Sequence, residues 1–284
     1  MADNYLEKRM EELRSGRLSH SASSRSAAQG PRAGYLNVKY PPRRVLVTGG
    51  ASGIGLTTVR SFLRAGCKVA VIDSDEEQGR RLAREEGVRF YHLDLADSDA
   101  LSRAMHDIFA AWHDLDIIVS NAGVFSAVAL EDSDPADFDR TLDVNLRPAY
   151  LMAREWALWR RALPYPNSYG GRMLLISSTR HLQSESGTEP YSASKGALAS
   201  LTHALMMSLA DYRITVNSIS PGWIHTGSPD EITDSDHRQH PSRRVGKPED
   251  VARLILFLTW PDNDFINGAD IPVDGGMTHR MIYD

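Results

Sequence analysis

Apolar, β-branched runs alternate with amphipathic helical patterns from Arg44 to the end of the chain. The runs have the length and composition of buried strands: Val45–Thr48, Val69–Asp73, Val88–Asp94, Leu115–Ser120, Met173–Ser177, Ile214–Ile219 and Ala269–Val273. The segments between them place apolar residues at helical spacing, over 54–65, 76–85, 98–113, 135–162, 190–211 and 248–259. Strands that alternate with helices predict an α/β fold, a single doubly wound (Rossmann-type) parallel sheet of seven strands flanked by helices.

The first 43 residues follow a different pattern. Asp3 or Asn4 could cap a short helix that ends near Arg14, and residues 15–34 have the Ser-, Ala-, Gly- and Arg-rich composition of a linker. We therefore expect an N-terminal arm over 1–43 and one domain over 44–284. The arm is basic, which fits either contact with an acidic surface of another subunit or a solvated extension.

Composition limits the function classes. The 284 residues carry a net charge of −5, which gives no general attraction to nucleic acid or to anionic membranes. A single cysteine, Cys67, cannot form an internal disulfide and is expected to be a buried apolar residue. We find no apolar run of about 18 residues and no secretory signal. These features predict a cytoplasmic enzyme without membrane or nucleic-acid partners.

A glycine-rich loop lies between the first expected strand and the first expected helix, over Thr48–Gly55. Glycines at 49, 53 and 55 allow a tight turn and a close approach of the backbone to a ligand. The helix that follows presents free N–H groups and a positive dipole end, which suit a pyrophosphate. The loop therefore predicts a dinucleotide site.

The second expected strand ends at Asp73, where a carboxylate can accept hydrogen bonds from an adenosine ribose. The same carboxylate would repel a 2′-phosphate, so the sequence favours NAD over NADP. The alternative is a structural role as a strand-end turn residue beside Asp75.

Tyr191 and Lys195 lie four residues apart within a helical pattern, so both side chains share one face of the helix. A free phenol has a pKa near ~10, and a neighbouring ammonium group favours the phenolate. The pair therefore predicts a phenol that exchanges protons near neutral pH. Such pairs also occur by chance in many helices, so the assignment depends on other motifs.

Taken together, the glycine loop, Asn121-Ala-Gly123 and Tyr191-x-x-x-Lys195 resemble the classical short-chain dehydrogenase/reductase family, from about Arg44 to the C-terminus. Other motifs that resemble the family are Asp94-Leu95, Asn145, Ser178, Pro221-Gly222, Thr226 and Val273-Asp-Gly-Gly276. The resemblance implies the following cofactor-binding residues: Gly49, Ser52, Gly53, Ile54, Gly55, Asp73, Asp94, Leu95, Asn121, Gly123, Tyr191, Lys195, Pro221, Ile224 and Thr226.

The resemblance also implies a catalytic set of Ser178, Tyr191, Lys195 and Asn145. Tyr191 would exchange the substrate proton, Lys195 would lower its pKa and bind the ribose, and Ser178 would donate a hydrogen bond to the substrate oxygen. Asn145 would hold a water that links Lys195 to solvent. Strand-end capping is an alternative for Ser178 or its neighbour Ser177, and helix capping or kinking is an alternative for Asn145.

The chain departs from the family in its long arm, in an apparent insertion at Pro164–Gly171 and in a compact segment between Thr226 and Arg243. These departures leave the catalytic set unchanged. They leave open the identity of the substrate and the form of the loop, or lid, that would cover it.

Several polar residues invite a guess at the substrate or at a metal. Arg180, His181 and His225 would lie near the pocket, where Arg180 could bind a carboxylate, although a solvated loop is the favoured interpretation. His237 and His240, with Asp234 and Asp236, resemble metal ligands only vaguely, and we expect no metal.

The main hypothesis is an NAD-dependent oxidoreductase that transfers a hydride between the nicotinamide and a secondary alcohol or carbonyl substrate. One alternative is a catalytically silent dinucleotide-sensing or scaffold protein on the same fold, and another is a lyase or epimerase that uses the phenol without net redox change. The resemblance implies a homotetramer or homodimer.

Overall fold

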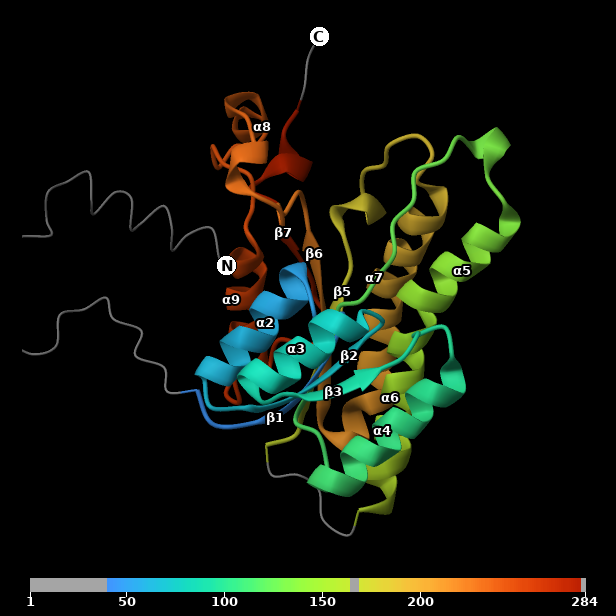
Figure 1. Ribbon diagram of the computed structural model, residues 1–284, viewed down its shortest axis with the longest axis vertical. Helices are drawn as coiled ribbons and strands as arrows, with labels where there is room; N and C mark the ends of the chain where they lie inside the picture. The colour runs from blue at the N-terminus through green and yellow to red at the C-terminus, as the bar shows by residue number, and fades with distance from the viewer. Residues whose placement is uncertain (1–39, 164–168, 282–284) are drawn as a thin grey trace, which may run out of the picture. The chain divides into compact units, whose positions relative to one another are not determined.

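A seven-stranded parallel sheet runs through the computed structural model, which describes residues 40–163 and 169–281 (Figure 1). The strands are β1 (Arg44–Thr48), β2 (Lys68–Asp73), β3 (Arg89–His92), β4 (Ile117–Ser120), β5 (Gly171–Ile176), β6 (Ile214–Pro221) and β7 (Asp270–Val273). Their order across the sheet is β3-β2-β1-β4-β5-β6-β7, and every pairing is parallel. The predicted fold class is confirmed.

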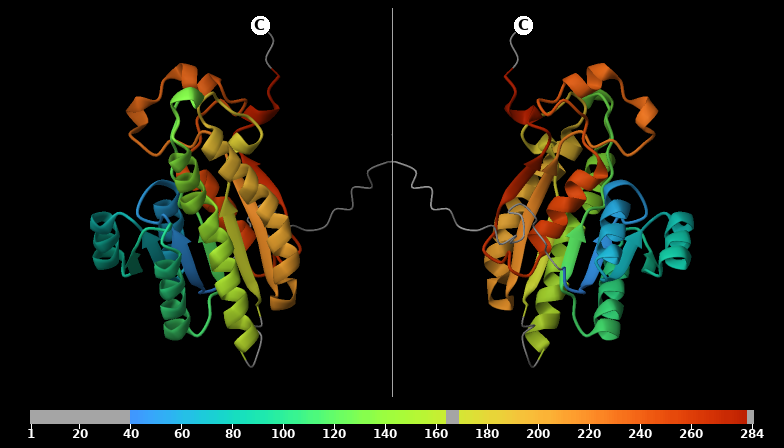
Figure 2. Two further views of the ribbon diagram at one scale, coloured as in Figure 1. Left: turned by 90° about the vertical axis from the view of Figure 1, so that its right-hand side faces the viewer. Right: turned by 90° about the vertical axis from the view of Figure 1, so that its left-hand side faces the viewer.

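Helices cover both faces of the sheet (Figure 2). The helices of eight residues or more are α2 (Gly53–Arg64), α3 (Glu76–Glu86), α4 (Ser98–Trp112), α5 (Pro135–Asn145), α6 (Arg147–Ala162), α7 (Glu189–Leu209) and α9 (Pro248–Thr259). Side chains of α4, α6 and α7 share one apolar cluster with Leu46, whereas those of α2, α3 and α9 share another with Val45 and Val47. Successive residues of β1 therefore point to opposite faces, as the strand geometry requires.

The predicted long helix over 135–162 is wrong, because the structure contains two helices, α5 and α6, that meet at Leu146. Pro148 lies in the first turn of α6 and cannot donate the N–H bond that a continuous helix needs there. The break places Asn145 at the C-terminal end of α5, where its side chain can reach the neighbouring loops.

The strand order reverses beside β1, since β2 continues the sheet on one side and β4 on the other. In open α/β sheets, ligands bind at the carboxyl ends of the strands at such a reversal. The glycine loop follows β1 and Asp73 ends β2, so both predicted cofactor elements lie at this edge.

Tyr40, the first described residue, packs on the helices beside β1. Its hydroxyl lies 2.8 Å from Thr259 Oγ1, and its ring packs edge-on against Phe62. The predicted short helix and linker of the arm lie outside the described residues, as does most of the predicted insertion at 164–171. The domain boundary at residues 43 and 44 stays a prediction. Within the described residues, no helix combines the length and the apolar character that a membrane crossing requires.

Candidate active site

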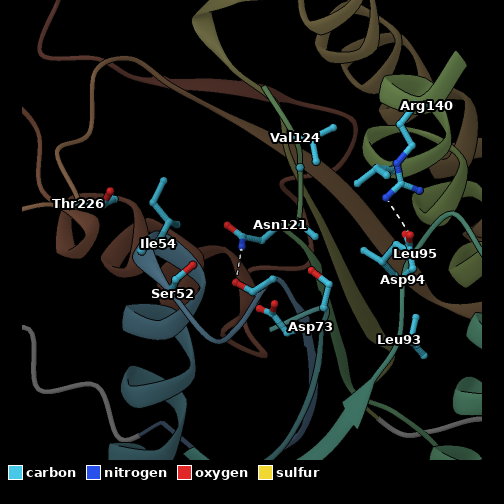
Figure 3. A pocket seen from close by; sticks show the side chains of 16 residues that line it. Ser52, Ile54, Asp73, Leu93, Asp94, Leu95, Asn121, Val124, Arg140 and Thr226 are labelled. Carbon is cyan, nitrogen blue, oxygen red and sulfur yellow. Dashed lines mark hydrogen bonds and ion pairs between the residues drawn. The ribbon is translucent and has the colours of Figure 1, made fainter. Parts of the chain in front are cut away.

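A cleft of about 460 Å³ opens at the carboxyl ends of the strands beside the reversal (Figure 3). Predicted cofactor residues line it: Gly49, Ser52, Gly53, Ile54, Asp73, Asp94, Leu95, Asn121, Gly123 and Thr226. The sequence did not single out Ser74, Leu93, Ala122, Val124, Arg140 and Val144, which complete the lining. A cleft of this size suits a small-molecule ligand.

The glycine loop is packed too closely for side chains. A Cβ on Gly55 would lie 1.8 Å from the carbonyl oxygen of Gly49, so the first turn of α2 sits directly on the loop. Gly49 and Gly53 have positive φ angles of +65° and +52°, a conformation that favours glycine. The loop therefore needs its glycines for backbone geometry, independently of any ligand.

Asn121 and Thr48 join the ends of β1 and β4. The Asn121 side-chain amide donates to the carbonyl oxygens of Thr48 and Gly49, at 3.1 and 3.0 Å. The Thr48 hydroxyl accepts from the Asn121 backbone N–H at 3.0 Å. Asn121 thus fixes the shape of the glycine loop from behind.

Asp73 lines the cleft and is already partly bonded. Its Oδ2 accepts from the backbone N–H of Ala51 at 2.9 Å, and its Oδ1 accepts from that of Asp75 at 3.0 Å. The turn role that the sequence offered as an alternative is therefore real. Each carboxylate oxygen can accept further hydrogen bonds, so this role does not exclude a ribose.

An ion pair between Asp94 and Arg140 forms another wall of the cleft (Figure 3). Arg140 Nη2 lies 2.8 Å from Asp94 Oδ2, and the hydrogen bonds from Arg140 and the Ala96 N–H hold the pKa of Asp94 below its usual value. Arg140 lies on α5, 46 residues after Asp94 in the sequence. No local motif could have indicated that the two residues pair.

Lys195 and Asn145 lie directly behind Gly123, a lining residue of the cleft. A Cβ on Gly123 would be 3.3 Å from Asn145 Oδ1 and 3.4 Å from Lys195 Nζ. Lys195 Nζ also donates to the carbonyl oxygen of Ile176 at 2.8 Å. The predicted proton-transfer residues on α5 and α7 therefore meet the predicted cofactor cleft at one point.

The Asn145 amide joins three parts of the site. Its Oδ1 accepts from the Val124 N–H at 2.7 Å, and its Nδ2 donates to the Val124 carbonyl and to Ser194 Oγ, each at 3.0 Å. Asn145 thus orients the loop after β4 against α7. The predicted water relay through Asn145 stays a prediction.

The neighbouring serines at the end of β5 have separate partners. The Ser177 hydroxyl donates to the Lys195 carbonyl at 2.8 Å, whereas Ser178 faces Tyr191 and its hydroxyl accepts from the Arg180 N–H at 3.2 Å. Ser178 therefore caps the short helix Thr179–His181, η2, and also lies next to the phenol. Ser178 rather than Ser177 is thus the serine beside Tyr191, and its catalytic role stays a prediction.

The electrostatics of Tyr191 differ from the prediction. Burial raises the pKa of its phenol above the usual value, while the Ser178 hydroxyl and the positive charge of Arg180 partly oppose the rise. Lys195 Nζ lies 5.4 Å from the centre of the Tyr191 ring and donates to the Ile176 carbonyl. The predicted lowering of the phenol pKa by Lys195 stays a prediction.

Burial also acts on Lys195 itself. The side chain is enclosed, and the loss of water lowers its pKa from 10.5 to about 8. Lys195 is thus close to a proton-exchange equilibrium in the neutral to mildly alkaline range.

Other predicted residues lie away from the cleft lining. Ile224 forms a bridge with Gly246 and lines a second cleft of about 420 Å³, and Pro221 is the last residue of β6. His181 Nε2 lies 3.0 Å from Asp270 Oδ2, and His225 Nε2 lies 2.7 Å from the Ser228 carbonyl. His225 therefore has a hydrogen-bond partner within the protein, whereas His181 Nε2 is near Asp270 without a hydrogen bond to any described residue.

His237 and His240 do not form a metal site with the neighbouring aspartates. The Val245 N–H donates to His237 Nδ1 at 3.1 Å, and His240 Nδ1 faces the Asp236 carbonyl at 3.2 Å. Among residues 40–163 and 169–281, no three His, Cys, Asp or Glu side chains gather into a group that could hold a metal ion.

A doubly wound sheet with a glycine-lined cleft and a buried lysine beside a half-buried tyrosine is typical of dinucleotide-dependent oxidoreductases. The family model described as enoyl-(acyl carrier protein) reductase, adh_short_C2, matches residues 49–278. The chain belongs to the classical short-chain dehydrogenase/reductase family.

Curated relatives support this assignment. An uncharacterized oxidoreductase of Thermotoga maritima is 40% identical over 256 residues, which cover 84% of this chain and 97% of the relative. The cyclopentanol dehydrogenase of a Comamonas species is 33% identical, and the matched region covers 82% of this chain and 96% of the relative.

Solved structures show the same similarity. An apo SCOR enzyme from Clostridium thermocellum has a TM-score of 0.77 and 37% identity, covering 85% of this chain and 95% of that enzyme. ElxO with NADP bound has a TM-score of 0.75 and 28% identity, covering 84% of this chain and all (100%) of that one. None of these comparisons supports the alternative of a catalytically silent protein.

Proposed function

We propose that the protein is an NAD(H)-dependent dehydrogenase that interconverts a secondary alcohol and its carbonyl compound, with Tyr191 as the acid/base. The observation that carries the proposal is the position of Gly123 between the cleft and Lys195 Nζ, which brings the proton-transfer residues against the cofactor site. A silent binding protein would need the cleft but not this arrangement.

The residues of the chain divide the chemistry in a simple way. A bound nicotinamide would supply the hydride acceptor or donor. Tyr191 takes the hydroxyl proton during oxidation, and Ser178 donates a hydrogen bond to the oxygen on which charge develops. The buried Lys195 ammonium, held by the Ile176 carbonyl, provides a positive charge beside the ribose and the phenol. Asn145 keeps the loop after β4 and α7 in register and, in this proposal, holds the water that connects Lys195 to solvent.

Asp73 supports NAD as the cofactor. Its carboxylate lines the cleft at the end of β2, where it can accept hydrogen bonds from ribose hydroxyls and repels a 2′-phosphate. Arg140, the nearby cation of the lining, already pairs with Asp94 and is thereby less available to a phosphate. A structural neighbour binds NADP, so the cofactor must be tested directly.

Relatives indicate the kind of alcohol. The Comamonas relative is a cyclopentanol dehydrogenase, so a cyclic secondary alcohol is the first substrate class to test. We further propose a homodimer or homotetramer, which sedimentation velocity would distinguish from a monomer.

The first experiment measures absorbance of reduced nicotinamide with NAD or NADP and a panel of cyclic, linear and aromatic secondary alcohols. We expect turnover with NAD. The panel should include an enoyl thioester with NADH, because the matching family model carries that description. Absence of turnover on the whole panel, or full activity of Tyr191→Phe on a substrate that is found, would contradict the proposal.

A separate variant tests the preference for NAD over NADP. Asp73→Ala should reduce the preference for NAD over NADP by about tenfold, as expected for loss of one charge repulsion near a phosphate. Asp75→Ala is the matched control, because Asp75 caps α3 and does not line the cleft. Tighter binding of NADP than of NAD by the unchanged protein, measured by calorimetry, would refute the assignment.

A further inference from the structure

The mouth of the active site contains an exposed aromatic ring beside the proposed acid/base. Phe125 follows Asn121-Ala-Gly123, is 56% exposed, and packs edge-on against Tyr191, with ring centres 5.1 Å apart and planes at 84°. Val124 and Val128 of the same loop are also exposed. Exposed apolar side chains that gather at one place mark a binding surface more often than a neutral feature.

This apolar wall is held in position by hydrogen bonds. The Val124 N–H donates to Asn145 Oδ1 at 2.7 Å, and the Val128 N–H donates to the Gly187 carbonyl at 3.0 Å. The second bond joins the loop after β4 to the loop before α7, and the two segments run close together above α7 (Figure 1). Phe125 is therefore exposed on a segment whose backbone is hydrogen-bonded on both sides of it, at Val124 and at Val128.

An arginine lies beside Ser178, in the loop before α7. Arg180 lies in η2, its backbone N–H donates to Ser178 Oγ at 3.2 Å, and its positive charge partly opposes the rise that burial causes in the pKa of Tyr191. Its side chain is only 26% exposed, whereas its partner Glu185 is 72% exposed, with Arg180 Nη2 2.7 Å from Glu185 Oε2. The guanidinium is thus largely covered, and the carboxylate that pairs with it lies in solvent.

Glu185 shows that Arg180 can accept a carboxylate in this geometry. An exposed ion pair contributes little, because water solvates the carboxylate well when it leaves. A carboxylate on a bound substrate could therefore take the place of Glu185 at small cost. Arginine is also the side chain whose planar fork fits a carboxylate bidentately.

We propose that the substrate is a cyclic secondary alcohol that carries a carboxylate, with its apolar ring against Phe125 and its carboxylate on Arg180 in exchange for Glu185. This inference rests on the proposed function and adds the substrate class to it. In the reaction, the alcohol carbon is oxidised to a ketone, NAD⁺ is reduced by the hydride, and the hydroxyl proton leaves through Tyr191. The carboxylate stays unchanged and only positions the ring.

The test compares 4-hydroxycyclohexanecarboxylate with its methyl ester as substrates of the full-length protein and NAD. We expect kcat/KM to be about threefold to fivefold higher for the acid, which is the effect of one partly exposed charge pair. Arg180→Met should remove the difference, and Arg180→Lys should restore part of it, because a lysine keeps the charge without the fork. The ratio of acid to ester is used because loss of Arg180 also changes the pKa of Tyr191.

Glu185→Gln gives the sharper result. If Glu185 competes with the substrate carboxylate, its removal raises the ratio of acid to ester about threefold, chiefly through KM. If the ion pair only stabilises the loop, the ratio is unchanged or falls. Matched controls are Arg60→Met and Glu86→Gln, which break a similar ion pair between α2 and α3 with a distance of 2.8 Å. Phe125→Ala should raise KM for both cyclic compounds and leave the ratio in place.

The outcomes separate this inference from the proposed function. Turnover of neutral cyclic alcohols without preference for the acid, or an equal loss for acid and ester in Arg180→Met, overturns the substrate class alone. Absence of turnover on every alcohol overturns the proposed function. In that case, calorimetry with cyclohexanecarboxylate and its methyl ester still tests Arg180, and equal binding of both compounds would overturn the inference.

Discussion

The proton-transfer residues and the substrate-facing loops differ sharply in how the fold holds them. Ser178, Lys195 and Asn145 are buried, and each has hydrogen-bond partners within the protein. Phe125, Leu182 and Trp223, on the loops above the strand ends, are exposed. The first group sits between the sheet and α7, and the second group contacts solvent on one side.

This difference separates chemistry from specificity. Buried groups have fixed geometry and shifted pKa values, so a change there affects the reaction on any substrate. Exposed loop side chains can be replaced with little effect on stability, so a change there alters the choice of substrate. The predictions below test this contrast, starting with the largest effect.

Tyr191→Phe removes the phenol hydroxyl that lies beside the buried residues Ser178 and Lys195. We expect kcat to fall about 10³-fold, the usual range for general acid/base catalysis, while NAD affinity stays within about threefold. Steady-state kinetics and calorimetry measure the two quantities. If kcat fell by less than about tenfold, the contrast between the proton-transfer residues and the substrate-facing loops would not hold for Tyr191.

Gly55→Ala should damage the cofactor cleft, because the new Cβ would lie 1.8 Å from the Gly49 carbonyl oxygen. We expect a loss of about 1–3 kcal/mol in the free energy of unfolding, together with loss of NAD binding. Gly196→Ala is the control for stability, since its Cβ would meet nothing closer than the Cβ of His181 at 4.0 Å. Equal melting temperatures for the two variants would contradict the close packing of the loop.

Lys195 should give the protein a characteristic dependence of stability on pH. Its pKa in the folded state is about 8, below the 10.5 of the unfolded chain, so between these values the unfolded state holds more protons. The contribution of Lys195 to stability is therefore lowest below pH 8 and rises toward pH 10.5, by at most about 1.4 kcal/mol per unit.

Urea unfolding of the wild type and of Lys195→Met, from pH 7.5 to pH 10, measures this slope. The difference between the two curves isolates Lys195, because the buried Cys67 and Tyr191 titrate in both proteins. Parallel curves would mean that Lys195 keeps an ordinary pKa and is not enclosed.

Arg140→Met should have the smallest effect. Arg140 and Asp94 are about half exposed, with side chains 48% and 51% accessible, so their ion pair is worth less than about 1 kcal/mol. We expect KM for NAD to change by less than about fivefold. Arg80→Met, which breaks the exposed pair with Glu76 on α3, should leave KM for NAD unchanged. A much larger effect of Arg140→Met would show that this wall contacts the cofactor directly.

The sequence predicted the sheet well because its signal is local. Buried parallel strands such as β1 and β2 are short, apolar and rich in β-branched residues, and the helices between the strands repeat their apolar residues at helical spacing. The helix break at Leu146 was missed because apolar periodicity continues through it, although Pro148 was a visible signal.

The glycine loop, Asp73, Tyr191 and Lys195 could be predicted as candidate site residues from residue type, spacing and family resemblance, because backbone geometry and proton chemistry each require particular side chains. The tertiary structure alone decided which distant groups meet them. It paired Arg140 with Asp94 and placed Phe125 on the ring of Tyr191. It directed Lys195 to the Ile176 carbonyl and partly buried the phenol of Tyr191, which raises its pKa. Burial and electrostatic fields depend on distances in space, and these arise only when separate elements pack together.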